Sequence, residues 1–96
     1  MKMLEKPIFI PLKAEYYEAF ENGTKNTEYR RYGKQWNERN CRIGRNVTLS
    51  YGYGKARRLR GIVTDFNIVG PDAHPAIRTV YPEGDQFAAI KIKVLR

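Results

Sequence analysis

The stretch Asn22-Gly23-Thr24-Lys25-Asn26-Thr27-Glu28-Tyr29-Arg30-Arg31-Tyr32 marks a change from helix to strand, and the predicted fold is organised around it. Asn-Gly often ends a helix, because glycine adopts the left-handed cap conformation without steric cost. Residues 27–32 are rich in β-branched and aromatic side chains, so they are expected to run extended. Alternation along this strand places Glu28 and Arg30 on one face. Lys25 follows the helix end, where the macrodipole favours a cation. Charged groups of both signs therefore gather at one junction.

Length and composition indicate a small soluble protein. Its 96 residues suit a single domain spanning 1–96. One cysteine, Cys41, allows no internal disulfide, and together with the lone His74 it does not complete a zinc site. No cofactor motif is present, so we expect neither a metal nor a cofactor. Residues 1–6 lack the apolar core of a signal peptide, and no apolar run approaches the roughly 20 residues of a membrane span. We therefore expect a cytoplasmic protein that does not bind a membrane.

The positive charge is concentrated in the middle third of the chain. Residues 1–29 contain four Lys and five Glu, and residues 61–96 contain four charges of each sign. Residues 30–60 contain ten Lys or Arg against one Glu, a balance of +9, so they carry the whole net charge of +8. Segregated charge of this kind favours a polyanion such as nucleic acid. The alternative is a solvated face that keeps a small protein soluble.

Hydrophobic patterns predict one helix and five strands. Leu12, Tyr16, Ala19 and Phe20 have helical spacing and are assigned to the core face of the helix. The register of apolar residues changes near Gly61, which predicts a β-bulge or a bend there. The expected strands span residues 7–11, 27–32, 46–51, 57–69 and 87–95.

Residues 70–86 contain three prolines and no sustained periodicity. An irregular segment of this length in a small domain usually forms a functional loop, a lid or a mobile segment. A twisted sheet of five or six mostly antiparallel strands that packs one face on a single helix tends to curl into a barrel. The sequence therefore predicts an α+β fold, a small β-barrel with one main N-terminal helix.

Aromatic residues are interleaved with the basic cluster. Cations neutralise phosphates and aromatic faces stack on unpaired bases, a combination that suits single-stranded or loop RNA better than the DNA major groove. Tyr51 is expected to face the core. The candidate nucleic-acid-binding residues are Arg31, Arg42, Arg45, Lys55, Arg57, Arg58, Arg60, Tyr32, Trp36 and Tyr53. A basic face that meets an acidic protein remains an alternative.

The charged junction allows two interpretations. In the first, Glu28 and Arg30 form an ion pair and Lys25 caps the helix, all for stability. In the second, the three residues line a ligand-binding cleft. Lys25 would then contact an anionic or carbonyl oxygen, Arg30 a phosphate or base edge, and Glu28 would hold a cation or act on a proton. Chemistry alone leaves both open.

The motif Gly23-x-Lys25-x-x-Glu28-x-Arg30, followed by the Ile43-Gly44 step, resembles the ASCH domain family of the PUA-like β-barrel superfamily. The chain departs from the family at Arg45, where an acidic residue is usual. The resemblance implies a small PUA-like barrel with a cleft beside the motif and a role in RNA metabolism. It therefore implies an RNA or nucleotide ligand.

The same resemblance implies a second function, hydrolysis. One subgroup of the family removes the acyl group of acetylated cytidine, and ribonuclease activity is attributed to other members. The subgroup's threonine nucleophile falls where this chain has Glu28. Thr27 is adjacent, but on a strand it would face the opposite way. Lys25 and Glu28 would be the catalytic residues of an enzyme that uses acid–base chemistry instead.

Overall fold

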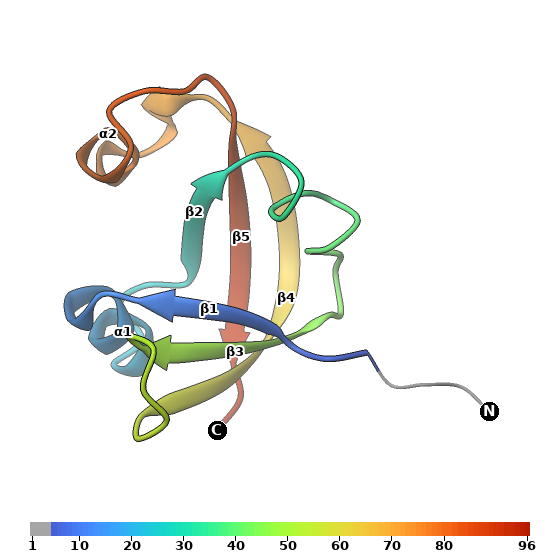
Figure 1. The fold of residues 1–96 in the computed structure, drawn as a ribbon, viewed down its shortest axis with the longest axis vertical. Coiled ribbons are helices and arrows are strands. Elements are labelled where there is room, and N and C mark those ends of the chain that lie inside the picture. The colour runs from blue at the N-terminus through green and yellow to red at the C-terminus, as the bar shows by residue number, and fades with distance from the viewer. Residues whose placement is uncertain (1–4) are drawn as a thin grey trace.

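The computed structural model describes residues 5–96. It contains five strands, one main helix, a short second helix and a 3-10 turn (Figure 1). The elements in chain order are β1 (Ile8–Leu12), α1 (Ala14–Glu21), β2 (Thr27–Arg31), β3 (Asn46–Tyr51), β4 (Arg58–Val69), η1 (Pro71–Ala73), α2 (Pro75–Val80) and β5 (Phe87–Val94).

All five strands belong to one sheet, in the order β1-β3-β4-β5-β2. The β1–β3 pair is parallel and the other three pairs are antiparallel. The sheet curls into a half-barrel, and α1 and α2 lie on the same side of it with β2 between them (Figure 1). The predicted α+β class, the mostly antiparallel sheet and the single main helix are confirmed.

The helix begins later than predicted and buries a different tyrosine. Leu12 is the last residue of β1, because a proline at position 11 is tolerated in an edge strand and does not end it. Tyr17 and Phe20 are the buried residues of α1, whereas Tyr16 is only partly buried. The predicted cap is confirmed: Gly23 has φ +87°, and the N–H groups of the next two residues donate to the Ala19 carbonyl.

The bulge in β4 is not at Gly61. The register against β5 shifts between Val63 and Asp65. Gly61 is instead a point of close approach, where an added Cβ would lie 2.7 Å from Ile92 Cγ2 and 3.1 Å from the Lys93 carbonyl oxygen. The glycine that the pattern marked is thus needed for the packing of β4 on β5.

The segment 70–86 is more regular than predicted. Pro75 occupies the first turn of α2, where its missing N–H costs nothing, and His74 Nδ1 accepts a hydrogen bond from the Ala76 N–H at 3.1 Å. Ile77 is 1% exposed and anchors the helix. Six residues are too few to give a helical period, so only the cap and the proline could have revealed α2.

The core lies on the concave face of the sheet. Alternate residues of β3 and β5 contribute to it, and Trp36 packs there from the irregular loop 33–45. Tyr51 is less buried than predicted: it is 38% exposed and lies at the border of the core, with its ring edge-on to that of buried Tyr17 and the two centroids 5.6 Å apart. Among residues 5–96, no helix is long and apolar enough to cross a membrane.

We expect Gly61→Ala to destabilise the fold by about 1–3 kcal/mol, the usual cost of overpacking a core. The matched control is Gly70→Ala, because Gly70 has negative φ and no atom within 4 Å of an added Cβ. That variant should be neutral or slightly stabilising. Urea unfolding of both proteins measures the difference, and equal midpoints would contradict the close approach at Gly61.

Candidate functional site

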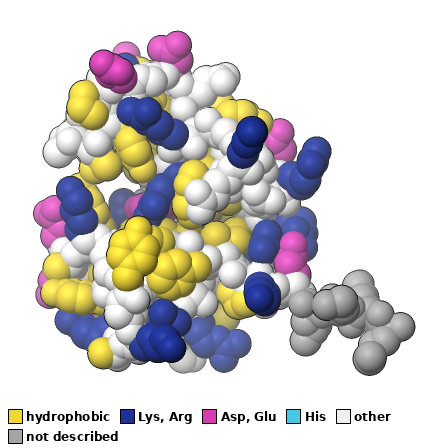
Figure 2. Space-filling view, in the orientation of Figure 1, with side chains coloured by type: hydrophobic (Ala, Val, Ile, Leu, Met, Phe, Trp, Pro, Cys, Tyr) yellow, Lys and Arg dark blue, Asp and Glu magenta, His cyan; other side chains and the backbone are white. Residues whose placement is uncertain are grey.

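A cavity of about 180 Å³ opens between α1, the end of β1, β2 and α2. Figure 2 shows this part of the surface hollowed, with basic and acidic side chains inside it. The charged residues Lys25, Glu28 and Arg30 line it together with Pro11. Most of the remaining wall is apolar or aromatic, from Leu12, Tyr16, Tyr29, Ile77, Val80 and Tyr81. The three residues that the sequence assigned to one junction thus share one cavity.

Arg30 is held from three sides. Its Nε donates to Glu28 Oε2 at 2.9 Å, as alternation along β2 predicts for residues on one face. Its second terminal nitrogen donates to the Pro11 carbonyl at 2.7 Å, and its guanidinium lies 5.0 Å from the centre of the Trp36 ring. β1 and β2 are the two edges of the sheet, so this side chain bridges the opening of the half-barrel.

Lys25 is enclosed by aromatic rings. Its Nζ lies 5.3 Å from the centre of the Tyr16 ring and 5.6 Å from those of Phe20 and Tyr29. The nearest carboxylate oxygen is Glu28 Oε1 at 3.8 Å, an ion pair without a hydrogen bond. Cation–π contacts hold the ammonium in place and leave its protons available to a ligand.

Burial displaces both members of this pair towards neutrality. Desolvation lowers the pKa of Lys25, against the opposing effect of Glu28. Desolvation also raises the pKa of Glu28, although Arg30 and Lys25 favour its ionised form. Side-chain exposure is 17% for Lys25 and 10% for Glu28, so water screens neither charge well. Groups with shifted pKa values in a cleft are typical of binding or catalytic sites.

One wall of the cavity was missed by sequence reasoning. Ala76, Ile77, Val80 and Tyr81 contribute from α2 and the residue after it. The sequence signals for this wall are the length and irregularity of the segment 70–86, typical of a functional loop, and the cap and proline that begin α2. Tyr16 lines the cavity as well, although its helical spacing had assigned it to the core.

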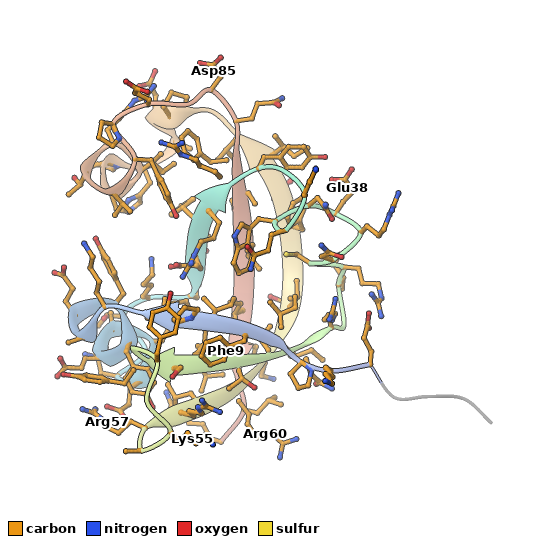
Figure 3. All side chains as sticks on the ribbon, viewed as in Figure 1. Phe9, Glu38, Lys55, Arg57, Arg60 and Asp85 are labelled. Carbon is orange, nitrogen blue, oxygen red and sulfur yellow. The ribbon has the colours of Figure 1, made fainter. Side chains whose placement is uncertain are left out.

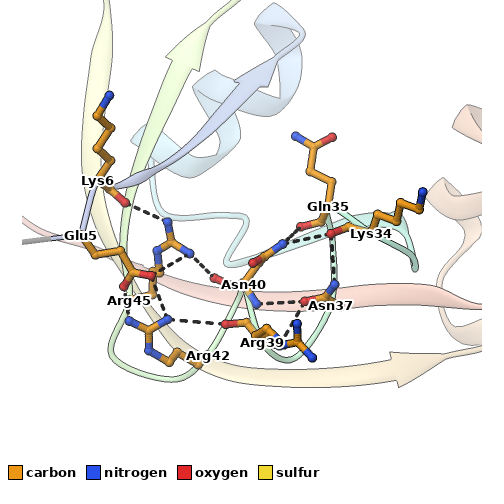
Figure 4. A network of polar contacts seen from close by, with 9 residues as sticks. All are labelled: Glu5, Lys6, Lys34, Gln35, Asn37, Arg39, Asn40, Arg42 and Arg45. Carbon is orange, nitrogen blue, oxygen red and sulfur yellow. Dashed lines mark hydrogen bonds and ion pairs between the residues drawn. The ribbon is translucent and has the colours of Figure 1, made fainter.

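The basic cluster divides into separate groups in space. Arg42 and Arg45 pair with Glu5, and Arg45 also donates to the carbonyls of Asn40 and Lys6, both at 2.9 Å (Figure 4). These contacts fix the loop 33–45 against the segment that precedes β1. Cys41, in the same loop, is fully buried, and burial raises the pKa of its thiol rather than lowering it.

The other predicted nucleic-acid-binding residues lie outside the cavity. Arg57 pairs with Glu21 at 3.0 Å and lies over two tyrosine rings, while Arg31 lies 5.5 Å from the centre of the Tyr81 ring. The Tyr32 hydroxyl donates to the Glu38 carboxylate. The predicted residues that remain exposed around the β3–β4 hairpin are Lys55, Arg58, Arg60 and Tyr53.

Comparison with known proteins gave no match, either to a protein-family model or to a curated protein. Among residues 5–96, no group of three or more His, Cys, Asp or Glu side chains could hold a metal ion.

We expect Arg30→Gln to destabilise the protein in a pH-dependent way, by about 3 kcal/mol near pH 7.5, because it leaves Glu28 buried without its main partner. A carboxyl whose pKa is raised on folding contributes stability that is fully present below its ordinary value of 4.5. This stability is lost as pH rises through the folded-state pKa. Losing Arg30 raises that pKa further. The difference in the free energy of unfolding between Arg30→Gln and the unaltered protein should therefore widen between pH 4.5 and about pH 7.5.

Urea unfolding at both pH values measures the gap. The control compares Glu28→Gln/Arg30→Gln with Glu28→Gln, since neither variant has the titrating carboxyl. The difference between these two should not change with pH. A gap for Arg30→Gln that is equally large at both pH values would contradict the role of Glu28.

Proposed function

We propose that the protein is an RNA-directed domain that holds one base of a single strand in the cavity beside Lys25, Glu28 and Arg30. The observation that carries the proposal is the convergence of two cations and one carboxylate, largely withheld from water, on a hollow with aromatic walls. Low solvent exposure strengthens hydrogen bonds from charged groups to a ligand.

The size of the cavity favours a single ring system. Its volume of about 180 Å³ is close to the ~150 Å³ that accommodates one benzene ring, and smaller than the ~300 Å³ at which drug-sized pockets begin. A nucleobase would enter, while its ribose and phosphate would stay at the mouth. Lys13 lines the cavity and is exposed, so it is placed to meet the phosphate.

The charged groups match the edge of a base. The Watson–Crick edge of a base combines ring or exocyclic N–H donors with carbonyl or ring-nitrogen acceptors. Lys25 would donate to an acceptor on this edge. Glu28 has unused acceptor capacity beyond its bond from Arg30, since a carboxylate has about four acceptor positions. The Tyr16 side chain, on the cavity wall, would contact the face of the base.

We also propose that the half-barrel is an ASCH domain of the PUA-like superfamily. Gly23 ends α1 with the positive φ that the motif's glycine implies, and the motif's Lys25, Glu28 and Arg30 line one cavity. Arg45 departs from the family pattern, and its guanidinium reaches two backbone carbonyls.

Lys25→Met keeps much of the side-chain volume and removes the charge, so we expect it to weaken binding of short fluorescent oligoadenylate and oligouridylate by roughly 10- to 100-fold. The matched control is Lys93→Met on the exposed side of β5, which should bind as the unaltered protein does. Fluorescence anisotropy measures both, and equal affinity of the two variants would contradict a ligand contact by Lys25.

The affinity should also fall with salt. If about five phosphates are neutralised, the logarithm of the association constant should change with the logarithm of salt concentration at a slope of roughly −3.5 on a single strand. Titrations at several salt concentrations measure this slope. An affinity independent of salt would contradict an RNA partner.

A hydrolase is the second candidate, because burial shifts the pKa of Lys25 down and that of Glu28 up, as acid–base catalysis requires. The substrate would be an acylated nucleoside, whose amide water would cleave to a carboxylic acid and an amine, or a strand of RNA. Thr27 does not line the cavity with Glu28: it lines a second hollow, which Lys25 also lines, and its hydroxyl is engaged as a donor to the Asn26 side-chain oxygen. A threonine nucleophile is therefore not favoured.

Incubation with acetylated cytidine and with single-stranded RNA tests this candidate. For an enzyme, product should form with the unaltered protein and be lost in Lys25→Ala. Chromatography of the products measures turnover. Binding of the strand without any product would contradict the hydrolase and leave the binding domain.

A further inference from the structure

A second aromatic and basic surface lies outside the cavity. Phe9 is 36% exposed and Tyr53 is 82% exposed, and their ring centroids are 6.3 Å apart at 42°. The guanidinium of Arg58 lies 5.2 Å from the centre of the Phe9 ring. We call these three residues the platform. Large aromatic side chains left in water beside a cation are typical of surfaces that stack on nucleic-acid bases.

The sheet and one turn bring the platform together. Phe9 on β1 pairs in register with Thr48 on β3, and Thr48 pairs with Arg60 on β4, so these side chains form one row on the convex face. Tyr53 arrives from the turn between β3 and β4. The Ser50 hydroxyl donates to the Gly54 carbonyl at 3.2 Å, which fixes this turn.

Three exposed cations lie at or near the platform. Lys55, Arg58 and Arg60 are exposed and, among residues 5–96, form no ion pair. Figure 3 places Phe9, Lys55 and Arg60 around β1 and the β3–β4 hairpin, and Figure 2 shows basic side chains below a hydrophobic cluster there. Unpaired cations beside exposed rings favour a polyanion. A second copy of this chain, with its net charge of +8, would bring like charges together.

We propose that the platform stacks a base next to the one in the cavity, so that the ligand is a strand and not a free nucleoside. This inference rests on the proposed function. Phe9 and Pro11 lie on the same face of β1, about 7 Å apart along the strand, and Pro11 lines the cavity. Because that distance is only about two base-stacking rises of ~3.4 Å, a short strand with one base in the cavity also reaches the platform.

The test uses Phe9→Ala/Tyr53→Ala and two probes, a fluorescent oligoadenylate and adenosine monophosphate. Loss of stacking should weaken binding of the strand by roughly 5- to 100-fold and leave binding of the mononucleotide unchanged. Tyr53→Phe is the matched control, because stacking needs the ring and not the hydroxyl, and it should bind the strand normally. Circular dichroism of each variant confirms that it is folded.

Strand affinity unchanged in the double variant, while Lys25→Met still weakens it, would overturn the platform and leave the cavity as the site. A strand that the unaltered protein does not bind would overturn both proposals. Binding of poly-glutamate in place of the strand, lost in the double variant, would overturn the platform's ligand in favour of an acidic protein.

Discussion

The hydrogen bond from Arg30 to the Pro11 carbonyl, at 2.7 Å, joins the two free edges of the sheet. A curled five-stranded sheet that does not close leaves backbone groups of its edge strands without strand partners. Here a side chain from β2 satisfies one such group on β1. The cavity lies at this seam, since Pro11 and Arg30 both line it. Closure of the half-barrel and formation of the candidate site therefore depend on the same guanidinium.

Because Arg30 serves both the fold and the site, the site is well ordered, but its buried charges lower the stability of the protein. Contacts with Glu28 and Trp36 restrict the Arg30 side chain, so this side chain loses little conformational entropy when a ligand binds. The cost is the burial of Glu28 and Lys25, whose pKa values are both displaced in the direction that disfavours charge. A fold selected for stability alone would gain from apolar residues at these positions. Retained buried charges are therefore an argument for function here.

Local patterns predicted what depends on local spacing. Residues a few positions apart are enough to predict the cap at Gly23, the shared face of Glu28 and Arg30, and the alternation of β5. Features set by distant contacts were missed. Arg45 meets Glu5 across 40 positions, and α2 is too short to show a period. Tyr17 is buried in place of the predicted Tyr16, because the helix starts only after Leu12 has ended β1.

Net charge is a poor guide to a binding surface until its internal partners are known. Of the ten cations in residues 30–60, Arg42, Arg45 and Arg57 pair with glutamates from the N-terminal part of the chain, and Arg30 pairs with Glu28. The acidic excess of residues 1–29 thus neutralises part of the basic third in space. In the described part of the chain, residues 5–96, Lys55, Arg58 and Arg60 form no ion pair. The polyanion argument therefore rests on these exposed cations of β4 and the β3–β4 turn, near the exposed ring of Phe9, more than on the total of +8.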